Sequence, residues 1–336
     1  MQVLNDVELR AFNTLKLSAR ARRLVEAASV DDLRAAVSAA EGGPIFVLGG
    51  GSNVVFARDI EALVLRPLLR GRELLGDDGE HRFIRLGAGE PWADAVAWTL
   101  AQGWGGLENL SLIPGSCGAA PIQNIGAYGV ELESVFERLE ALDLASGELR
   151  EFTRTECRFG YRDSIFKREA AGRYVITALV LRLPLRWQAQ LGYRELADEL
   201  ARAGIAGATP QQVAAAVIAL RQRKLPDWRV LGNAGSFFKN PVVDAAVFAA
   251  LRGANPDIVG HCQADGRFKL AAGWLIERAG WKGRDLGRVG MYERQALVLV
   301  NRGDASGAEV LALCAAVRAA VRERFGVLLE PEPSFV

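Results

Sequence analysis

The chain has 336 residues, 50% of them hydrophobic, and its 41 lysine and arginine residues balance 40 aspartate and glutamate residues to a formal charge of +1. This length exceeds what one hydrophobic core usually supports, so we expect two or three packed units. The even charge argues against a general nucleic-acid-binding protein, and any anionic ligand must be met by local basic groups.

The first third of the chain is predicted to mix helices and strands. Ser29 precedes a segment with two acidic residues in its first turn, which predicts a capped helix, and PIFVLGG then predicts a strand that runs into glycines. The apolar runs EALVLRPL and HRFIRLGAG predict two further strands. In PWADAVAWTLAQG a helix is expected to begin at Pro91 and to end at Gly103.

The segment between Gly103 and Gly129 is dense in glycine and keeps neither a helical nor a strand period. A stretch this long without regular structure is usually functional or disordered, and its apolar content argues against disorder. Further along, GRYVITALVLRLP combines apolar and β-branched residues, which predicts a buried strand that ends at Pro184.

The composition changes after this strand, and we place a domain boundary near here. The alanine-rich run ELADELARAGIAGATPQQVAAAVIALRQRK predicts helix, with Thr209 as a cap and Pro210 in the first helical position. The last third predicts a helix at KLAAGWLIERAG, a strand at QALVLVN and a long helix at SGAEVLALCAAVRAAVRERFG that ends at Gly326.

Cysteine and histidine are too few and too scattered for several kinds of site. The four cysteines form no CxxC pair, which argues against a zinc site or a redox dithiol. A catalytic triad or a histidine-rich metal centre would depend on His81 or His261, so we expect no metal. The N-terminal residues do not resemble a signal peptide, and no run is long enough to span a bilayer, so we expect a cytoplasmic protein without a membrane partner.

Two glycine-rich segments are candidates for holding a large cofactor. In LGGGSNVVF, glycines let successive backbone N–H groups converge on an anion, and a serine and an asparagine add donors, which suits a pyrophosphate. In SLIPGSCGAAPIQNIGAYG, prolines stiffen a segment whose glycines allow the backbone to approach a flat ligand. An ordinary strand-to-loop turn and a packed Ω-type loop stay open as alternatives, but two such segments favour a dinucleotide.

Other segments offer groups that could act on an anionic substrate. The planar fork of Arg162 in YRDSIFK suits a carboxylate, although an Arg–Asp neighbour pair is more often a surface feature. Arg221 and Lys224 lie one helical turn apart, where they can reach one anion or simply complement the helix dipole. A glycine-containing turn in GNAGSFFKNP could expose Ser236. Two prolines hold Glu332 in an extended tail, although most terminal glutamates are merely solvated.

Together these segments resemble the UDP-N-acetylenolpyruvoylglucosamine reductase family, flavoenzymes of cell-wall precursor synthesis. LGGGSN, PGSCGAAPIQNIGAYG, YRDS, GNAGSFFKNP and the final EPE occur in the family's order, over nearly the whole chain. The resemblance implies an α+β fold, with an FAD-binding domain of the vanillyl-alcohol-oxidase (PCMH) type in two subdomains and a C-terminal α/β substrate-binding domain. The expected boundaries are 1–70, to which the tail 327–336 returns, then 71–205 and 206–326.

The resemblance also implies FAD as cofactor and NADPH as co-substrate. FAD would be held by residues of the two glycine-rich segments, namely Gly49, Gly50, Gly51, Ser52, Asn53, Pro114, Gly115, Ser116, Gly118, Ala119, Gln123, Asn124, Gly126, Ala127 and Tyr128. Because neither histidine lies in these segments, we expect the flavin to be bound without a covalent link, and we do not expect Cys117 to attach it.

The implied reaction is the NADPH-dependent, FAD-mediated reduction of UDP-N-acetylglucosamine enolpyruvate to UDP-N-acetylmuramate. Arg162 and Glu332 would lie on the carboxylate where negative charge builds, and Ser236 would donate a proton. The family's diphosphate and uridine contacts are matched by Tyr193, Arg221, Lys224, Asn240 and Gln295. The stretch around Tyr193 resembles the substrate-covering loop of the longer family subtype, and we expect a monomer.

The tail departs from the family pattern. PSFV follows Glu332 where a Val-Arg continuation is expected, so a basic group usually near that carboxylate is missing. Two other functions stay open. An oxidase of small alcohols would keep the glycine loops, and rapid reoxidation of its flavin by oxygen would favour it. A non-catalytic nucleotide-sugar-binding protein is refuted if the protein is yellow and turns over NADPH only with the enolpyruvyl substrate.

Overall fold

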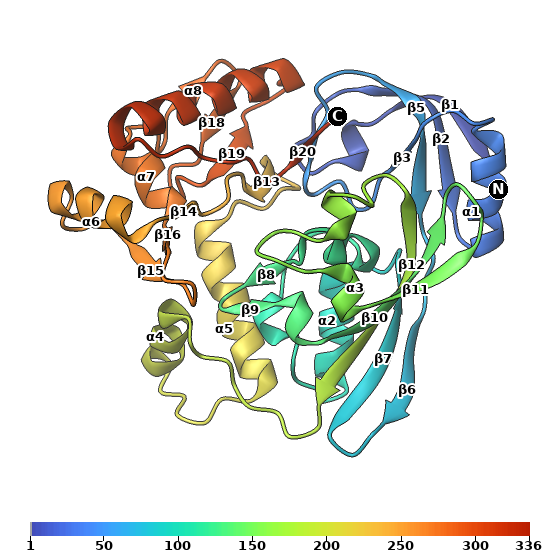
Figure 1. Cartoon of the computed structure of the whole chain (residues 1–336), viewed down its shortest axis with the longest axis horizontal. Helices are drawn as coiled ribbons and strands as arrows, with labels where there is room; N and C mark the ends of the chain where they lie inside the picture. The colour runs from blue at the N-terminus through green and yellow to red at the C-terminus, as the bar shows by residue number, and fades with distance from the viewer. Residues whose placement is uncertain (1) are drawn as a thin grey trace. The chain divides into compact units, whose positions relative to one another are not determined.

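The chain crosses several times between two units in this computed structural model, which describes residues 2–336 (Figure 1). Unit 1 is formed by the residues up to Val7, by Ala21–Gly51 and by Ile60–Gln222; unit 2 is formed by Glu8–Arg20, Ser52–Asp59 and Arg223–Val336. The glycine motif at 49–53 therefore begins in unit 1 and ends in unit 2.

The first sheet of unit 1 has the strand order β1-β2-β5-β3, and β5 runs parallel to both β2 and β3. Its strands are β1 (Val3–Glu8), β2 (Arg20–Ala27), β3 (Ile45–Val47) and β5 (Ile60–Pro67). Helix α1 (Val30–Ala39) buries Leu33 and Ala36 in the same apolar cluster as Leu63 of β5. The predicted cap is confirmed, because Ser29 Oγ accepts the Asp32 N–H and the Asp32 carboxylate accepts the Ser29 N–H.

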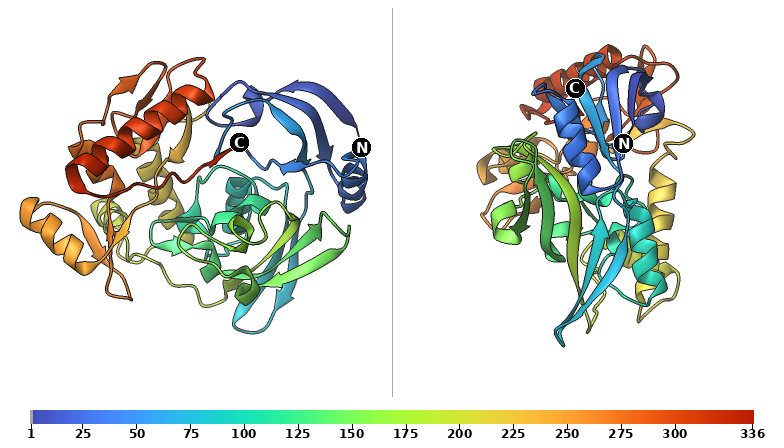
Figure 2. Two further views of the ribbon diagram at one scale, coloured as in Figure 1. Left: turned by 45° about the horizontal axis from the view of Figure 1, so that its top comes forward. Right: turned by 90° about the vertical axis from the view of Figure 1, so that its right-hand side faces the viewer.

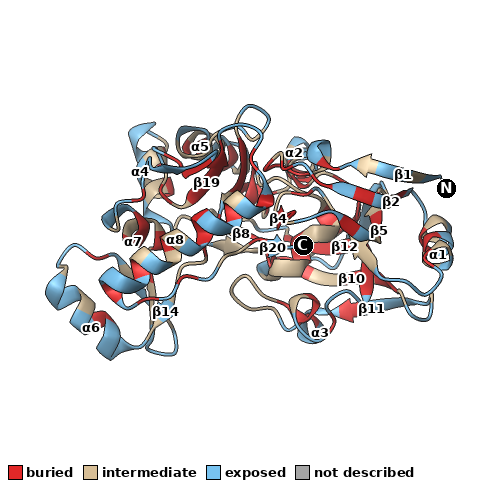
Figure 3. Ribbon diagram, turned by 90° about the horizontal axis from the view of Figure 1, so that it is seen from above, coloured by how far each residue is buried: buried red, intermediate tan, exposed pale blue. Residues whose placement is uncertain are grey.

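The second sheet of unit 1 is antiparallel and has the order β11-β10-β12-β7-β6. Its strands are β6 (Arg72–Asp77), β7 (His81–Gly87), β10 (Phe136–Asp143), β11 (Leu149–Thr153) and β12 (Tyr174–Pro184). β6 and β7 form a long hairpin (Figure 2). The predicted buried strand is confirmed, since β12 is buried over most of its length and ends at Pro184 (Figure 3). Helix α2 (Trp92–Ala101) begins one residue after Pro91, which is its N-cap.

The glycine-rich segment of unit 1 is packed although it lacks long regular elements. It contains the 3₁₀ helices η2 (Glu108–Leu110) and η3 (Cys117–Gln123) and the strand β8 (Gly126–Ala127). Directly after it, β9 (Val130–Glu131) pairs with β8 as a hairpin, and the 3₁₀ helix η4 (Leu132–Ser134) follows. Leu107, Leu110 and Ala120 lie in the core beneath the second sheet, as the apolar content predicted. The short helices α3 (Arg154–Cys157) and η5 (Ile165–Lys167) complete this part.

The last helices of unit 1 are α4 (Arg194–Arg202) and α5 (Pro210–Lys224). Unit 1 ends at Gln222, so the last two residues of α5 belong to unit 2. As predicted, Thr209 precedes α5 and its Oγ1 accepts the Gln212 N–H.

Unit 2 contains an antiparallel sheet of order β13-β19-β18-β17, a small sheet of order β14-β16-β15 and a parallel pair of β20 with β4. Its strands are β4 (Val54–Val55), β13 (Gly232–Ser236), β14 (Val242–Val243), β15 (Gly260–Cys262), β16 (Phe268–Leu270), β17 (Asp285–Leu286), β18 (Val289–Met291), β19 (Val298–Asn301) and β20 (Ser334–Phe335). The helical elements are η1 (Arg10–Phe12), α6 (Ala245–Ala254), α7 (Ala272–Arg278) and α8 (Gly307–Phe325).

The long C-terminal helix was predicted correctly, since α8 ends at Gly326, whose φ is 68°. The helix predicted from Lys269 starts later than expected. Lys269 and Leu270 belong to β16 and pair with residues of β14 and β15, so α7 begins only at Ala272. None of the helices in residues 2–336 has both the length and the apolar stretch that a bilayer crossing requires.

Candidate functional site

The two glycine-rich segments meet within unit 1. A Cβ on Gly50 would lie 2.7 Å from the Cα of Gly115, and one on Gly49 would lie 3.0 Å from Ser116 Oγ. On the other side of the second segment, a Cβ on Gly118 would lie 2.6 Å from the Cβ of Ala88. These approaches require glycine, because any side chain would push the two loops apart. The structure therefore brings Gly49–Gly51 against the segment around Gly115, as a shared cofactor site requires.

Both loops carry unpaired backbone donors. The N–H groups of Gly49, Gly50, Gly51, Gly115 and Ser116 donate to no acceptor within residues 2–336. Gly51 is buried, and its φ is 62°. Gly50 is exposed and Gly49, Gly115 and Ser116 are partly exposed, so water can satisfy their N–H groups. Buried N–H groups are nearly always paired in folded proteins, so the unpaired N–H of Gly51 is the one that indicates a ligand that accepts hydrogen bonds. The donor set fits the diphosphate of FAD, since converging N–H groups bind anions.

The rest of the first glycine motif lies in unit 2, beside the C-terminal tail. Asn53 Nδ2 donates to the backbone oxygen of Glu332 at 3.3 Å, and the Ser334 N–H donates to the Asn53 oxygen at 3.0 Å. The pairing of β20 with β4 continues this contact. Asn53 and Glu332, which are 279 residues apart in sequence, are thus held together by hydrogen bonds.

Ser236 and Glu332 lie on hydrogen-bonded segments of unit 2. Ser236 ends β13 opposite Val298, after an irregularity in the pairing that begins at Asn233. Gly235 adopts a φ of 67° and donates its N–H to Asn233 Oδ1, and Ser236 is exposed beyond it. The Glu332 N–H donates to the oxygen of Phe237, the residue after Ser236, at 2.9 Å. The structure therefore brings these two predicted residues together.

A second contact fixes the tail just before Glu332. The Lys239 N–H donates to the Glu330 oxygen at 2.9 Å, and Lys239 Nζ contacts the Glu330 carboxylate at 2.5 Å. An ion pair and a backbone bond at the same two residues leave little freedom for the extended tail.

Asn240 and Gln295 meet at the beginning of α7. Asn240 Oδ1 accepts the N–H of Ala272, the first residue of that helix, at 3.0 Å. Gln295 Oε1 lies 3.1 Å from the position of a Cβ on Gly273, the next residue. Both predicted substrate-binding side chains therefore lie at one helix N-terminus. Lys224 was also predicted to bind the substrate; it is the last residue of α5 and belongs to unit 2.

Arg162 contacts a predicted cofactor-binding residue within unit 1. Its Nη2 donates to the Gly126 oxygen at 2.6 Å, and its side chain is 17% exposed. The sequence left open an ion pair between Arg162 and its neighbour Asp163. In the structure the Asp163 carboxylate pairs with Arg168, whose Nε lies 3.2 Å away. Arg162 pairs with Glu131 instead, at 3.8 Å.

Tyr193 and Arg221 both lie near Tyr128. The rings of Tyr128 and Tyr193 meet edge to face, with centroids 5.2 Å apart. Burial raises the pKa of the Tyr193 hydroxyl, and Glu195 adds to the shift. Burial lowers the pKa of the Arg221 guanidinium, and its Nε is buried without a hydrogen-bond partner. A buried cation with an unsatisfied donor is costly unless an anion pairs with it, which suits a substrate phosphate.

Two asparagine side chains organise this region; sequence reasoning missed Asn109 and did not foresee the packing role of Asn124. Asn109 is buried, and its Nδ2 donates to the oxygens of Tyr128 and Gln190, both at 2.9 Å. It joins the β8–β9 hairpin to the segment that precedes Tyr193. Asn124 was predicted to bind the cofactor, and its fully buried side chain makes its hydrogen bonds to Glu131, Glu133 and Gly160. No sequence pattern marks such contacts, because they join segments far apart in the chain.

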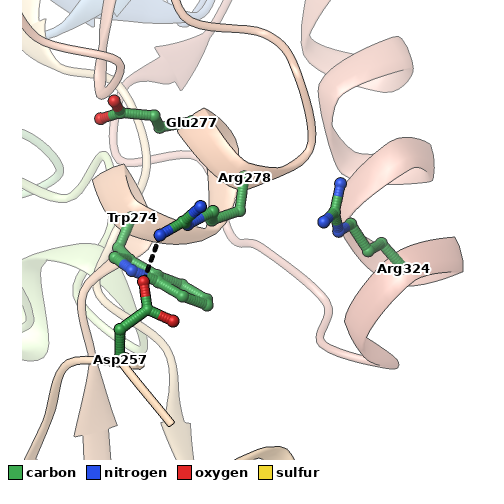
Figure 4. Close-up of a pocket in the computed structure, with 5 residues that line it drawn as sticks. All are labelled: Asp257, Trp274, Glu277, Arg278 and Arg324. Carbon is green, nitrogen blue, oxygen red and sulfur yellow. Dashed lines mark hydrogen bonds and ion pairs between the residues drawn. The ribbon is translucent and has the colours of Figure 1, made fainter. Parts of the chain in front are cut away.

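A hollow of about 540 Å³ in unit 2 has no predicted site residue in its lining, which consists of Asp257, Trp274, Glu277, Arg278 and Arg324 (Figure 4). Arg278 pairs with Asp257, and its guanidinium lies 5.6 Å from the Trp274 ring. Glu277 is paired with Lys282 at 2.9 Å. Asp257 and Arg278 therefore neutralise each other and Glu277 is neutralised by Lys282 outside the lining, whereas Arg324 makes no ion pair within residues 2–336.

Comparison with known proteins matches both halves of the chain. Residues 226–336 match the family model described as UDP-N-acetylenolpyruvoylglucosamine reductase, C-terminal domain, and residues 21–153 match one described as an FAD binding domain. These two ranges contain the exposed serine and the converging glycine loops, respectively.

Similar proteins cover the chain from end to end. It is 56% identical to the UDP-N-acetylenolpyruvoylglucosamine reductase of Azoarcus sp. (strain BH72), over 100% of this chain and 98% of that protein. For the corresponding protein of Burkholderia vietnamiensis the identity is 54%, over 99% and 97%. The crystal structure of UDP-N-acetylenolpyruvylglucosamine reductase from Thermus caldophilus shares the fold, with a TM-score of 0.70 and 24% identity over 100% of this chain and 99% of that one.

Proposed function

Because the chain belongs to the UDP-N-acetylenolpyruvoylglucosamine reductase family, we propose that Arg162, Ser236 and Glu332 carry the family's reaction in it. The chain is a UDP-N-acetylmuramate dehydrogenase of peptidoglycan synthesis that uses FAD and NADPH, and the predicted α+β fold with an FAD-binding domain of the vanillyl-alcohol-oxidase type is confirmed. The observation that supports the catalytic assignment most strongly is the hydrogen bond from the Glu332 N–H to the oxygen of Phe237, next to Ser236.

The cofactor is proposed to bind along the two glycine loops. The unpaired N–H groups of Gly49–Gly51, Gly115 and Ser116 would hold its diphosphate. When bound, FAD supplies the hydride chemistry between NADPH and the enolpyruvyl double bond. Cys117 is fully buried, and burial raises the pKa of its thiol, so no thiolate is available to form a covalent link. We therefore propose non-covalent binding.

The substrate carboxylate is proposed to lie on Arg162 and Glu332. The Arg162 guanidinium would bind it with its planar fork, and Glu332, carrying a proton, would donate a hydrogen bond to the charge that builds there. With the hydride delivered to the terminal carbon of the enolpyruvyl double bond, Ser236 Oγ would donate a proton to the other carbon, next to that carboxylate. Serine is a weak acid, so this transfer works only when the carbon has become strongly basic; acid catalysis of this kind contributes roughly 10² to 10⁴-fold.

The UDP portion is proposed to bind Tyr193, Arg221, Lys224, Asn240 and Gln295. The unsatisfied Nε of Arg221 suits a phosphate oxygen. The ring contact of Tyr193 with Tyr128 supports a covering role for the loop that carries Tyr193, as in the longer family subtype.

We also propose that the chain is organised as two FAD-binding subdomains at 1–70 and 71–205 and a substrate-binding domain at 206–326. The separate sheets β1-β2-β5-β3 and β11-β10-β12-β7-β6 support the first division, and the pairing of β20 with β4 supports return of the tail 327–336 to the first segment. We also propose that the protein is a cytoplasmic monomer, in keeping with the family resemblance.

The function is tested by absorption spectroscopy of the freshly purified protein. A yellow protein whose flavin band is bleached by NADPH and restored by UDP-N-acetylglucosamine enolpyruvate, with UDP-N-acetylmuramate as the product, supports it. Restoration of the band by oxygen at the same rate without the sugar nucleotide would favour an oxidase instead.

A further inference from the structure

Arg162 reaches its position from a strained turn. Gly160 and Asp163 exchange backbone hydrogen bonds of 3.0 and 3.1 Å, and Arg162 between them has a φ of 54°. The left-handed region is unfavourable for a residue with a Cβ, and such conformations persist where the surroundings hold them. The turn is therefore held by contacts that Arg162 makes outside it.

Two acceptors on one hairpin engage the guanidinium. Glu131 Oε1 lies 3.8 Å from Arg162 Nη1, and the Gly126 oxygen accepts from Nη2. Gly126 and Glu131 face each other across the β8–β9 pair, so the two acceptors keep a constant separation. A Cβ on Gly126 would lie 2.9 Å from both Arg162 Nη1 and Glu131 Cγ, which shows how closely the three residues pack.

Asn124 anchors the Glu131 carboxylate in turn. Its Nδ2 donates to Glu131 Oε2 at 3.1 Å and to the Gly160 oxygen at 3.2 Å, and its Oδ1 accepts the Glu133 N–H at 3.0 Å. Asn124 is fully buried. One side chain thus joins the carboxylate of Glu131 to the first residue of the turn that carries Arg162, so both partners of the ion pair are attached to the same support.

We infer that Glu131, held by Asn124, is a positioning residue that orients the Arg162 guanidinium for the substrate carboxylate; this inference rests on the proposed role of Arg162. A planar fork that is already oriented loses less conformational freedom when a carboxylate binds. Glu131 also carries a negative charge that opposes the incoming carboxylate, so the benefit of orientation must exceed that repulsion.

The test compares two nucleotides that differ in the lactyl ether, the group that carries the carboxylate. UDP-N-acetylmuramate carries the lactyl carboxylate and UDP-N-acetylglucosamine lacks it. Titration calorimetry of the FAD-loaded enzyme measures both affinities for wild type, Glu131→Ala, Glu131→Gln, Arg162→Ala and the double variant of Glu131→Ala with Arg162→Ala. The matched control is Glu133→Gln, which removes a nearby charge whose side chain is not part of this network.

Glu131→Ala is expected to weaken binding of UDP-N-acetylmuramate about fivefold, the scale of a partly exposed ion pair, since 3.8 Å is too long for a hydrogen bond, and to leave binding of UDP-N-acetylglucosamine within about twofold. Glu131→Gln keeps an acceptor and is expected to retain part of the preference. In the Arg162→Ala background, Glu131→Ala is expected to add nothing, because the two residues act as a unit. Glu133→Gln should change neither affinity.

Equal weakening of both nucleotides in Glu131→Ala would overturn the inference, since it would indicate a merely structural role. Tighter binding of UDP-N-acetylmuramate in Glu131→Ala or Glu131→Gln would overturn it too, because Glu131 would then only oppose the substrate's charge. The same holds if Arg162→Ala removes the preference for the carboxylate while Glu131→Ala leaves it intact. Should Arg162→Ala itself leave the preference unchanged, the proposed role of Arg162 fails, and the inference with it.

Discussion

Replacing Gly50 by alanine separates the two loops that we propose to hold the cofactor. The new Cβ would lie 2.7 Å from the Cα and 3.1 Å from the carbonyl carbon of Gly115. Carbon atoms in contact normally lie about 3.5 to 4 Å apart, so the loops must move by about 1 Å. Both atoms belong to backbone, which cannot rotate away. Gly50 is not among the residues with positive φ, so the clash is the source of any effect.

Overpacking of this kind costs about 1 to 3 kcal/mol. If the loops have to meet again to bind the diphosphate, FAD affinity should fall roughly 5- to 150-fold, since about 1.4 kcal/mol corresponds to a factor of ten. Fluorescence titration of the apoprotein with FAD measures the affinity. Gly207→Ala is the control, because nothing lies within 4 Å of its added Cβ and its φ is ordinary. An FAD affinity of Gly50→Ala within about twofold of the control would refute the reasoning.

Three other predictions follow from single groups. Glu332→Gln is expected to leave flavin reduction by NADPH intact while stopped-flow reoxidation by the enolpyruvyl substrate slows by about 10² to 10³-fold; equal slowing of both steps would contradict it. Arg288 and the Ser306 N–H lower the pKa of Glu309 from 4.5 to about 2, so its contribution to stability is present above pH 4.5 and is lost as the pH falls toward 2. Urea unfolding should therefore show Glu309→Gln to be less stable than wild type at neutral pH, with a difference that shrinks over that range; a constant difference would contradict it. A thiol reagent should modify exposed Cys262 in the native protein and spare Cys117, Cys157 and Cys314, since burial raises the pKa of Cys157 to about 12 and of Cys314 to about 11; rapid modification of a second thiol, located by mass spectrometry, would contradict it.

Local signals in the sequence predicted the elements whose ends depend on neighbouring residues. The cap at Ser29, the start of α5 after Thr209 and the end of α8 at Gly326 each follow from side-chain or backbone chemistry within one turn. The helix predicted at Lys269 began too early, because pairing of Lys269 in β16 depends on strands elsewhere in the chain. The helix or strand propensity of a segment does not predict which other strands it will pair with.

Part of the candidate site could likewise be predicted from local sequence signals, and part could not. Glycines marked the two loops, because close backbone approach and positive φ leave a trace in residue type. The partner of Arg162 could not be read from the sequence: its neighbour Asp163 was the obvious candidate, and the structure pairs Arg162 with Glu131, 31 positions away in the chain. Asn109 likewise gave no signal, since its two acceptors belong to Tyr128 and Gln190.

The catalytic assignment is tested most directly by Ser236→Ala in rapid mixing. Only the reduction of the sugar nucleotide needs a proton from Ser236, so bleaching of the flavin by NADPH should proceed at nearly the wild-type rate. Return of the flavin band on addition of UDP-N-acetylglucosamine enolpyruvate should slow by at least about 10²-fold. Wild-type recovery of the band, or an equal loss in both steps, would contradict the assignment.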